Sequence, residues 1–363
     1  MNTQSPNHSI TKSLNHQITQ LLNHSITKSL NSPTCLVLYS GGLDSILACK
    51  ILQEQGIHVI ALYFITPFFG YKLKGRERIS KKKVFADQGI QFKEIDISDV
   101  YLKMVKNPKH GYGKYINPCI DCKILMVREA MKILGEFNAS FVATGEVLGQ
   151  RPMSQRRDAL RIIERDSGAD GLLLRPLSAL HLPSTDPENK GLVDRSRLLG
   201  LTGRGRKDQI ALACKYGIKE YPAPAGGCVL ADPILSRRFK RMFELWPEFD
   251  VNDSVFAQRG KHFLMPDKSW LVIGRDEREN AKIVSMIRKG DIRLDLTAVP
   301  GPTGLWRKIY SEVNADLAAS ILCRYARLKN RPGEVKLSGP GTENIRTIRT
   351  MSASDETINR YRM

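Results

Sequence analysis

Residues 39–45 read Tyr39-Ser40-Gly41-Gly42-Leu43-Asp44-Ser45 and separate an apolar run from a segment with helical spacing. Residues 35–39 predict a buried strand, and residues 45–55 predict a helix that ends before Gly56. A glycine pair after a strand lets backbone N–H groups converge, and a helix start adds unpaired N–H groups and a positive dipole end. The stretch therefore predicts an anion-binding turn of phosphate size.

Strands and helices alternate beyond this turn. Strands are expected at 58–64, 91–97, 140–144 and 172–174, and helices at 76–87, 124–137 and 206–215. The alternation predicts an α/β fold, a Rossmann-like parallel sheet with helices on both faces, whose ligand lies at the carboxyl ends of the strands. A basic helix at 236–246, then strands at 270–274 and 292–296 flanking a helix at 277–289, predict a bridge to a small α+β C-terminal domain.

The composition changes at both ends of the chain. Residues 7–30 repeat an octad, NHSITKSL, NHQITQLL and NHSITKSL, and residues after 331 are mostly polar. We expect a disordered leader and a flexible tail. The expected segments are the leader 1–33, the nucleotide-binding domain 34–235, a linker helix 236–255, the small domain 256–330 and the tail 331–363.

The overall charge favours a polyanionic partner. The chain has 363 residues, 56 Lys and Arg against 37 Asp and Glu, and a net charge of +19, although a merely basic surface is the alternative. No apolar run is long enough for a membrane span, and the N-terminus lacks a secretory signal pattern. Seven cysteines fit a reducing compartment, so the sequence predicts a cytoplasmic protein without a membrane partner.

The glycine turn is neither a Walker loop nor a G-x-G-x-x-G turn. Its Ser-Gly-Gly-x-Asp-Ser pattern resembles the PP-loop of the N-type ATP pyrophosphatases, which adenylate a substrate and release pyrophosphate. The resemblance implies an adenine nucleotide alpha hydrolase-like fold and ATP with Mg²⁺ as cofactors. It assigns Asp44 to magnesium, the hydroxyls of Ser40 and Ser45 to phosphate oxygens, and the N–H groups of Gly41 and Gly42 to the transferring phosphate.

Three cysteines are candidates for metal binding or nucleophilic catalysis. Cys119 and Cys122 have C-x-x-C spacing near an expected helix start, and Cys228 follows the flexible turn 222–227. Three thiols suit a [4Fe-4S] cluster with one open iron, and they are too few for a four-thiolate zinc site. Redox or persulfide cysteines, and structural or zinc-bound thiols, are the alternatives. Core packing is expected for the cysteines at positions 35, 49, 214 and 323.

A second set of motifs narrows the resemblance. Thr144-Gly145-Glu146-Val147-Leu148-Gly149-Gln150 is followed by Ser154-Gln155 and by Leu174-Arg175-Pro176-Leu177. The series resembles the adenylating domain of the ThiI-type 4-thiouridine synthetases over residues 35–235. The resemblance implies that the ATP site is lined by the PP-loop residues together with Leu38, Tyr39, Tyr63, Phe64, Lys123, Gly145 and Gln155. For Tyr63 and Phe64, a plain core strand is the alternative.

The resemblance implies a tRNA thiolase that adenylates a uridine carbonyl and replaces its oxygen with sulfur, giving 4-thiouridine or 2-thiouridine. The sulfur donor would be a cysteine desulfurase or free sulfide. The oligomeric state stays open, with a homodimer as one alternative. We expect neither a THUMP module before Cys35 nor a rhodanese-like domain after the catalytic half, which agrees with cluster-delivered sulfur. The alternatives are an amide- or nitrile-forming ligase similar to the 7-cyano-7-deazaguanine synthases, and a non-catalytic RNA-binding protein.

RNA contacts are expected in both halves of the chain. Residues 256–309 resemble the NFACT-R module, which is thought to contact RNA. Basic residues also cluster in the first half, where they would contact phosphates without reading sequence, unless they form ordinary solvated helix faces. The clusters are Lys72, Lys74, Arg76, Arg78, Lys81, Lys82 and Lys83, and Arg151, Arg156, Arg157, Arg161 and Arg165.

Overall fold

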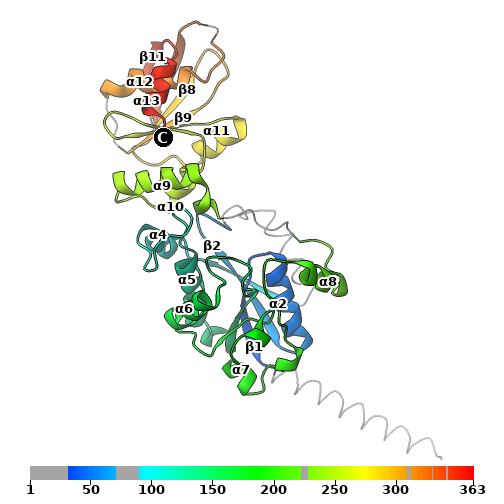
Figure 1. Cartoon of the computed structure of the whole chain (residues 1–363). Coiled ribbons are helices and arrows are strands. Elements are labelled where there is room, and N and C mark those ends of the chain that lie inside the picture. Colours follow the sequence, from blue (N-terminus) through cyan, green and yellow to red (C-terminus); the bar gives the residue numbers. More distant parts are fainter. Residues whose placement is uncertain (1–31, 71–89, 222–227, 309–311, 329, 341) are drawn as a thin grey trace, which may run out of the picture.

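The computed structural model describes residues 32–70, 90–221, 228–308, 312–328, 330–340 and 342–363 (Figure 1). The octad leader up to residue 31, the expected helix 76–87, the basic cluster 72–83 and the turn 222–227 lie outside these ranges. No helix in the described ranges has the length and apolar character needed to cross a bilayer.

The N-terminal domain is an α/β domain with a five-stranded sheet in the order β3-β2-β1-β4-β5, and every strand pair is parallel. This confirms the expected parallel sheet. The bounds are β1 Thr34–Leu38, α2 Leu43–Glu54, β2 His58–Ile65, β3 Gln91–Asp96, α4 Ser98–Lys106, α5 Cys119–Lys132, β4 Ala139–Thr144, α6 Arg157–Ser167, β5 Leu173–Leu174, α7 Asp186–Asn189 and α8 Lys207–Lys215.

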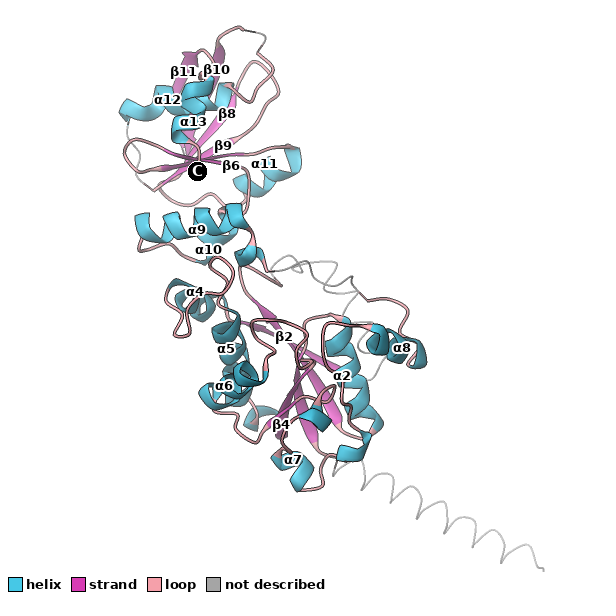
Figure 2. Ribbon diagram, in the orientation of Figure 1, coloured by secondary structure: helices cyan, strands magenta, loops and turns pink. Residues whose placement is uncertain are grey.

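Helices cover both faces of this sheet, as the alternation predicts (Figure 2). Alternate residues of β1 point to opposite faces, as the two-residue period of a strand requires. Leu36 and Leu38 pack with residues of α4, α5 and α6, whereas Cys35 and Val37 pack with residues of α2 and α8. Both faces are thus buried, which explains the continuous apolar run of β1.

The α5 helix begins earlier than expected. The apolar spacing predicts a helix over 124–137, but α5 runs from Cys119 to Lys132 and is followed by a short 3-10 turn at Gly135–Phe137. Pro118 precedes the first residue and Asp121 lies in the first turn, where a carboxylate is favoured by the helix dipole. The two thiols of the C-x-x-C motif therefore lie within the first turn of the helix.

The C-terminal domain contains a six-stranded sheet in the order β11-β10-β8-β9-β7-β6, with every pair antiparallel. Two helices, α9 and α10, connect it to the N-terminal domain (Figure 1). The bounds are α9 Pro233–Leu245, α10 Val251–Phe256, β6 Lys261–Leu264, β7 Trp270–Ile273, α11 Glu277–Val284, β8 Ile292–Leu296, β9 Gly304–Arg307, α12 Ala315–Cys323, β10 Gly333–Gly339, β11 Thr342–Thr350 and α13 Asp355–Tyr361.

The two domains share a hydrophobic core across the connecting helices. Trp270 and Val272 of β7 belong to the same buried cluster as Phe239 of α9, Phe256 of α10 and Tyr101 of α4. Leu271 and Ile273, on the other face of β7, pack against α12 in a separate cluster. The connection is therefore a packed joint rather than a loose linker.

The expected flexible tail after residue 331 is wrong. These residues form the hairpin of β10 and β11 and the helix α13. Val335, Leu337 and Ile348 are buried against the C-terminal core, whereas Glu334 and Arg349 are exposed. β11 is the edge strand and β10 is its neighbour. One face of this hairpin is exposed to solvent, so many of its side chains are polar and the average composition hides the strand pattern.

Candidate functional site

The turn between β1 and α2 brings two serine hydroxyls to the start of the helix, and the Gly42 N–H donates to the Ser40 hydroxyl at 3.3 Å. Gly42 is the N-cap of α2 and provides no side-chain cap, and Gly41 has a φ of +82°. The Ser45 hydroxyl donates to the Gly42 carbonyl at 2.7 Å, and the hydroxyls of Ser40 and Ser45 lie 3.3 Å apart. The geometry matches the predicted anion-binding turn, with two hydroxyl groups beside the start of a helix.

Asp44 lies in the first turn of α2 and points toward residues from distant parts of the chain. Its Oδ2 accepts a hydrogen bond from Gln150 Nε2 at 2.9 Å, and Arg206 Nη2 lies 3.9 Å from Oδ1. Within the described residues, the buried Oδ1 atom has no hydrogen-bond partner. A buried carboxylate oxygen in this state is suited to a cation that the chain does not supply.

Arg206 and Gln209 are site residues that the sequence reading does not identify. Arg206 precedes α8, and Gln209 of that helix donates from Nε2 to Gln150 Oε1 at 3.5 Å. Gln209 is 2% exposed, so an amide in the first turn of a short helix is fully enclosed. The basic run Arg204-Gly205-Arg206-Lys207 ahead of this helix is the one local signal for the contact.

Gly145 supports the PP-loop by direct backbone contact. A Cβ atom at this position would lie 2.5 Å from the backbone carbon and oxygen of Asp44 and 2.6 Å from the Ser45 nitrogen. Only glycine permits this approach, because real Cβ atoms do not come so close to backbone atoms. Gly145 thus lies at the expected site, where it packs against the loop that would bind phosphate.

The Thr-Gly-Glu and Leu-Arg-Pro-Leu motifs meet in a buried ion pair. Arg175 Nε lies 3.3 Å from Glu146 Oε2, which also accepts from Thr144 Oγ1 at 3.1 Å. Arg175 further pairs with Glu164 of α6. Lys123 Nζ lies 3.9 Å from Glu146 Oε1, which links α5 to the carboxyl end of β4. These motifs fix the strand end that carries Gly145.

The remaining expected ATP-site residues divide into core and surface. Leu38 and Phe64 are buried in the hydrophobic core, so the core alternative holds for the Phe64 side chain. Tyr39 and Tyr63 are half-buried, and their rings lie 6.4 and 5.8 Å from the ring of Phe92. The Gln155 carbonyl accepts from the Gly149 N–H at 2.7 Å and closes the loop after Gln150.

The structure brings the three candidate cysteines into one neighbourhood. Burial, together with the nearby thiols of Cys228 and Cys119, raises the pKa of the Cys122 thiol to about 12. Burial likewise raises the pKa of Cys228, on which Cys119 acts in the same direction. Cys122 and Cys228 pack against the same core cluster, and the Tyr101 hydroxyl hydrogen-bonds to Cys122.

The thiols are not arranged as a finished metal site. Within the described residues, no three His, Cys, Asp or Glu side chains are positioned to hold a metal ion. The three thiols nevertheless affect one another electrostatically, and their thiolate forms are disfavoured by burial and by mutual repulsion. A cationic iron centre would reverse both effects, so the donor set fits a cluster after local rearrangement.

Arg151 connects the phosphate loop to the thiols. It follows Gln150, the residue that donates to Asp44, and its charge lowers the pKa of Cys119 against the larger effect of burial. The same charge acts in the same direction on Cys228. One dipeptide therefore touches Asp44 on one side and approaches two thiols on the other.

A polar cluster supports the first turn of α5 from behind. His110 Nδ1 lies 3.1 Å from Asp121 Oδ1, and His110 Nε2 lies 3.2 Å from Asp166 Oδ2. Asp166 is also bound by Lys109 at 2.8 Å and Arg165 at 2.7 Å, contacts that hold the pKa of its carboxyl well below the usual range. The sequence reading did not identify His110, which no motif marks.

The second basic cluster is partly neutralised. Arg156 pairs with Asp158, Arg161 with Asp170, and Arg165 with Asp166, each through a close ion pair. These exposed arginines form a solvated helix face around α6, as the alternative to an RNA site predicts. Arg151 differs from them, because its charge lowers the pKa values of Cys119 and Cys228 against the larger effect of burial.

The two domains of this protein match different protein families. Residues 31–182 match the family described as thiamine biosynthesis protein (ThiI), and residues 260–362 match the NFACT protein RNA binding domain. A tRNA sulfurtransferase from Haemophilus influenzae (strain PittEE) is 30% identical over 144 residues, which are 39% of this chain and 28% of the relative. The tRNA-specific 2-thiouridylase MnmA of Dehalococcoides mccartyi is 32% identical over 120 residues, 30% of this chain and 33% of the relative.

A probable tRNA sulfurtransferase from Thermococcus kodakarensis is 28% identical over 167 residues, 46% of this chain and 40% of the relative. The chain thus spans about a third of the length of these curated relatives.

Two solved structures are also similar. The U34-tRNA thiolase NcsA from Methanococcus maripaludis with its [4Fe-4S] cluster has a TM-score of 0.33 and 17% identity, over 62% of this chain and 71% of the other. A 4-thiouridine synthetase–RNA complex with bound ATP has a TM-score of 0.34 and 18% identity, over 62% and 53%. On the two domain matches, residues 31–182 form a ThiI-family domain and residues 260–362 an NFACT-type RNA-binding domain.

Proposed function

We propose that this protein is an ATP-dependent tRNA thiolase that adenylates a uridine carbonyl and replaces its oxygen with sulfur. The observation that carries the proposal is the position of Gln150 and Arg151. Gln150 binds Asp44 of the PP-loop, and Arg151 acts on Cys119 and Cys228. An adenylating loop and a set of thiols are the two parts that an oxygen-to-sulfur exchange requires.

The first half of the reaction belongs to the PP-loop. ATP would bind with its phosphates on the N–H groups of Gly41 and Gly42 and the hydroxyls of Ser40 and Ser45. Mg²⁺ would bind at Asp44, where the unpartnered Oδ1 fits a cation and would supply charge neutralisation. Arg206 adds a positive charge at the same carboxylate. The uridine oxygen attacks the α-phosphate, the bond to the β-phosphate breaks, and pyrophosphate leaves.

The second half of the reaction belongs to Cys119, Cys122 and Cys228. A [4Fe-4S] cluster held by the three thiols would supply an iron without a protein ligand, which can bind an external sulfur atom. Cys122 and Cys228 are partly buried against the core, and the Tyr101 hydroxyl bonds to Cys122. Sulfur attack at the uridine carbon breaks the carbon–oxygen bond, and AMP leaves.

A persulfide on Cys228 is the second sulfur route. Its terminal sulfur attacks the activated carbon, and AMP leaves with the oxygen. The thiolate of Cys119 or Cys122 then attacks the Cys228 sulfur, which breaks the sulfur–sulfur bond and frees the thiocarbonyl. The remaining disulfide requires two electrons from an external dithiol. This route needs a persulfide donor such as a cysteine desulfurase, whereas the cluster route can use free sulfide.

The partner assignment follows from the C-terminal domain. We propose tRNA as the substrate because residues 260–362 match an RNA-binding domain and curated relatives carry tRNA thiolase names. The net charge of +19 supports a polyanion. A reducing compartment, the cytoplasm, fits thiols that must stay reduced. A homodimer is compatible with this function and is not required by it.

The test separates the two half-reactions. The full chain, reconstituted anaerobically with iron and sulfide, is given ATP and bulk tRNA, and both pyrophosphate and thiouridine are measured. Asp44→Asn should abolish pyrophosphate release, whereas Asp99→Asn, an exposed acid on α4, should not change it. Cys228→Ala should keep pyrophosphate release and lose thiouridine. Cys214 is exposed and not in the core as expected, so the control Cys214→Ala should keep both.

Each alternative gives a different result. Wild-type thiouridine yields from Cys228→Ala would exclude both sulfur routes. Pyrophosphate release that needs a small carboxylic acid and ammonia instead of tRNA would identify an amide- or nitrile-forming ligase. Tight tRNA binding without pyrophosphate release would identify a non-catalytic RNA-binding protein. Iron-dependent absorbance near 400 nm that disappears in Cys122→Ala would distinguish the cluster from the persulfide.

A further inference from the structure

A groove of about 670 Å³ lies where the N-terminal domain meets α9. Its walls come from the end of α4, the loop 107–118 and the exposed side of α9. The lining includes two tyrosines, three cations and one acid: Tyr112, Tyr115, Lys106, Arg237, Lys240 and Glu244. None of these residues belongs to the PP-loop or to the thiols, so the groove is a separate surface.

The two tyrosines present aromatic surface to solvent. Tyr112 is 42% exposed and Tyr115 is 46% exposed. The Tyr112 hydroxyl donates to the Val105 carbonyl at 2.6 Å, which fixes the ring against α4. Tyr115 has a φ of +59°, a left-handed conformation that costs a non-glycine residue free energy. The Lys114 ammonium lies 5.5 Å from the centroid of the Tyr115 ring, which places a further cation beside this aromatic surface.

Cations lie on the opposite wall. Arg237 and Lys240 are three residues apart on α9, so they project from the same helix face, and both are exposed. Lys106 Nζ donates to the carbonyls of Pro247 at 2.9 Å and Phe249 at 2.8 Å, and it closes the far end of the groove. Glu244 is four residues after Lys240 and reduces, without cancelling, the positive charge.

The loop that lines the groove continues into the helix that carries two of the candidate thiols. Ile116 lines the groove, and Cys119 follows three residues later at the start of α5. The Gly113 N–H donates to the Asn117 carbonyl at 2.9 Å, and the Asn117 side chain hydrogen-bonds to Cys119. The tyrosine loop and the first thiol are therefore parts of one short, hydrogen-bonded turn.

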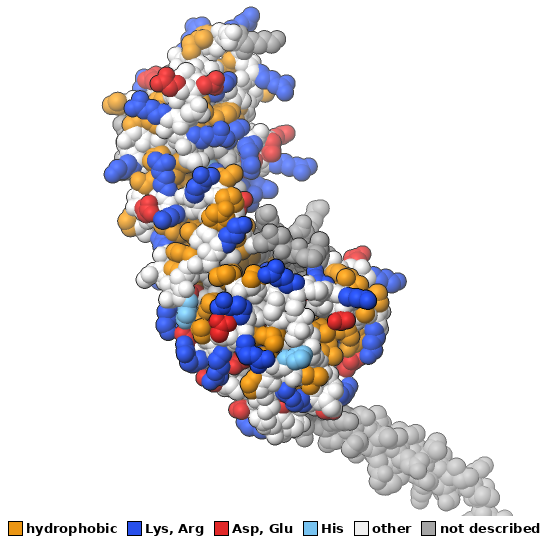
Figure 3. All heavy atoms as spheres, viewed as in Figure 1, with side chains coloured by type: hydrophobic (Ala, Val, Ile, Leu, Met, Phe, Trp, Pro, Cys, Tyr) orange, Lys and Arg blue, Asp and Glu red, His pale blue; other side chains and the backbone are white. Residues whose placement is uncertain are grey.

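We propose that this groove binds an unpaired nucleotide of the RNA substrate, with its base stacked on Tyr115 and its flanking phosphates at Arg237 and Lys240. Exposed aromatic faces beside cations are the combination that binds single-stranded nucleic acid with little sequence preference. Lys and Arg side chains extend over both domains on the face shown in Figure 3, which agrees with a polyanion that contacts both. The proposal deepens the proposed function, because the groove would position a nucleotide beside the one that reacts.

The first test uses the backbone conformation of Tyr115. Asn adopts the left-handed region more readily than Tyr, so Tyr115→Asn should fold at least as stably as the wild type. Binding of a fluorescein-labelled oligouridylate to the full chain should nevertheless weaken roughly 5- to 100-fold, because the stacking platform is removed. Tyr115→Phe, which keeps the ring, should bind as the wild type does. A purely structural role for the ring predicts the reverse: lower stability and unchanged binding.

The second test uses two neighbouring residues of α9. Lys240 lines the groove and Arg241 does not, although both are exposed. Lys240→Ala should reduce the slope of log affinity against log salt by about 1, whereas Arg241→Ala should leave that slope unchanged. Equal effects of the two variants would indicate a diffuse basic surface and overturn the proposal. This comparison remains informative even if Tyr115→Asn fails to fold.

A third measurement identifies the contact directly. An oligouridylate carrying 5-iodouracil should photocrosslink to Tyr115 or Tyr112 on irradiation, and peptide mass spectrometry would locate the adduct. Crosslinks confined to residues 260–362 would overturn the proposal, as would unchanged oligouridylate binding in a Tyr112→Leu, Tyr115→Asn double variant. Binding does not require catalysis, so RNA binding in the groove can be confirmed without thiolation activity. Thiolation by the double variant at the wild-type KM for tRNA would reject the groove proposal and leave the proposed function intact.

Discussion

Gln150 Nε2 lies 2.9 Å from Asp44 Oδ2, which joins the residue that ends the Thr-Gly-Glu motif to the acid of the PP-loop. The contact spans 106 positions of sequence. It exists because β1 and β4 are neighbours in the sheet, so the segments after both strands meet at the same edge. Asp44 is held on one side, and its other oxygen stays available.

Gln150→Ala should slow pyrophosphate release. Loss of a hydrogen bond to a charged group costs about 1.5–3 kcal/mol, which corresponds to roughly 10- to 150-fold in the concentration of Mg–ATP needed. The effect should appear in KM for Mg–ATP measured with saturating tRNA. Gln91→Ala, an exposed glutamine at the start of β3, is the matched control. Equal KM values for both variants would show that Asp44 does not depend on Gln150.

Gly145→Ala should damage the PP-loop without unfolding the domain. The added methyl group would lie 2.5 Å from the Asp44 backbone, so the loop must move away from β4. We expect ATP binding by isothermal titration to weaken at least tenfold. Gly135→Ala is the control, because a Cβ atom there meets no atom within 4 Å. Wild-type ATP affinity in Gly145→Ala would mean that the loop position does not matter for the nucleotide.

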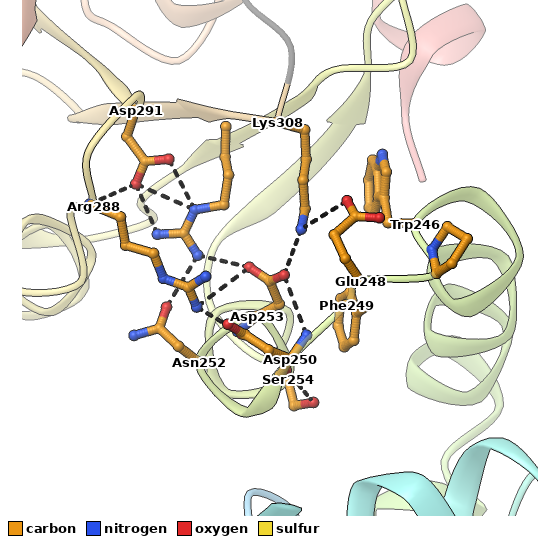
Figure 4. A network of polar contacts seen from close by, with 12 residues as sticks. Trp246, Glu248, Phe249, Asp250, Asn252, Asp253, Ser254, Arg288, Asp291 and Lys308 are labelled. Carbon is orange, nitrogen blue, oxygen red and sulfur yellow. Dashed lines mark hydrogen bonds and ion pairs between the residues drawn. The ribbon is translucent and has the colours of Figure 1, made fainter.

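Arg307→Ala should destabilise the joint between the domains. Arg307 donates to Asp291 at 2.8 Å and to Asp253 of α10 at 2.9 Å, and Lys308 binds Asp253 at 2.6 Å in the network shown in Figure 4. Asp253 and Asp291 are both buried, so removal of Arg307 takes away the guanidinium that pairs with Asp291 and leaves Asp253 to Lys308, at a cost of about 3–5 kcal/mol.

Urea unfolding of this variant followed by tryptophan fluorescence would measure the loss, because Trp270 lies in the shared core. Arg349→Ala, at an exposed position of β11, should change the free energy of unfolding by less than about 0.5 kcal/mol. A loss of similar size in both variants would contradict a specific role for the network.

The metal-free protein should lose stability as the pH rises above about 9. Burial raises the pKa values of Cys49 and Cys122 to about 12 in the folded state, whereas the pKa of a thiol in the unfolded chain is about 9.0. Above that value the unfolded chain binds fewer protons than the folded chain, so each thiol can remove up to about 1.4 kcal/mol per pH unit.

Urea unfolding of the metal-free protein from about pH 8 to about pH 10 would measure this slope. Cys122→Ala should make the slope shallower, and Cys214→Ala, at an exposed thiol, should not. An unchanged slope in Cys122→Ala would show that its thiol does not stay protonated in the folded state.

Local sequence patterns predicted most of the N-terminal fold. The apolar runs at β1, β2 and β4 marked buried strands, and the Ser-Gly-Gly-x-Asp-Ser turn marked the start of α2 to within two residues. The sequence did not reveal the sheet order β3-β2-β1-β4-β5, on which all contacts to Asp44 depend. Arg206 reaches Asp44 through tertiary structure, and the basic run that contains it does not indicate which residue it contacts.

The wrong predictions for β10, β11 and the start of α5 have the same physical cause. The strands β10 and β11 expose one face. Their only strand pattern is the alternation of apolar and polar residues within a segment that is polar on average. The early start of α5 depends on Pro118 and on Asp121, which binds His110, and not on apolar spacing. In both cases the deciding interactions are polar or long-range, whereas the sequence reading relied on hydrophobic periodicity.

The core shared through α9 and α10 holds the RNA-binding domain at a fixed distance from the PP-loop domain. An RNA bound by residues 260–362 would reach the PP-loop at one distance and in one orientation. The stacked rings of Trp246 and Trp270 hold the two domains together at this position. Selection of a nucleotide would then depend on its distance along the folded RNA from the gripped element, and the identity of neighbouring bases would matter less.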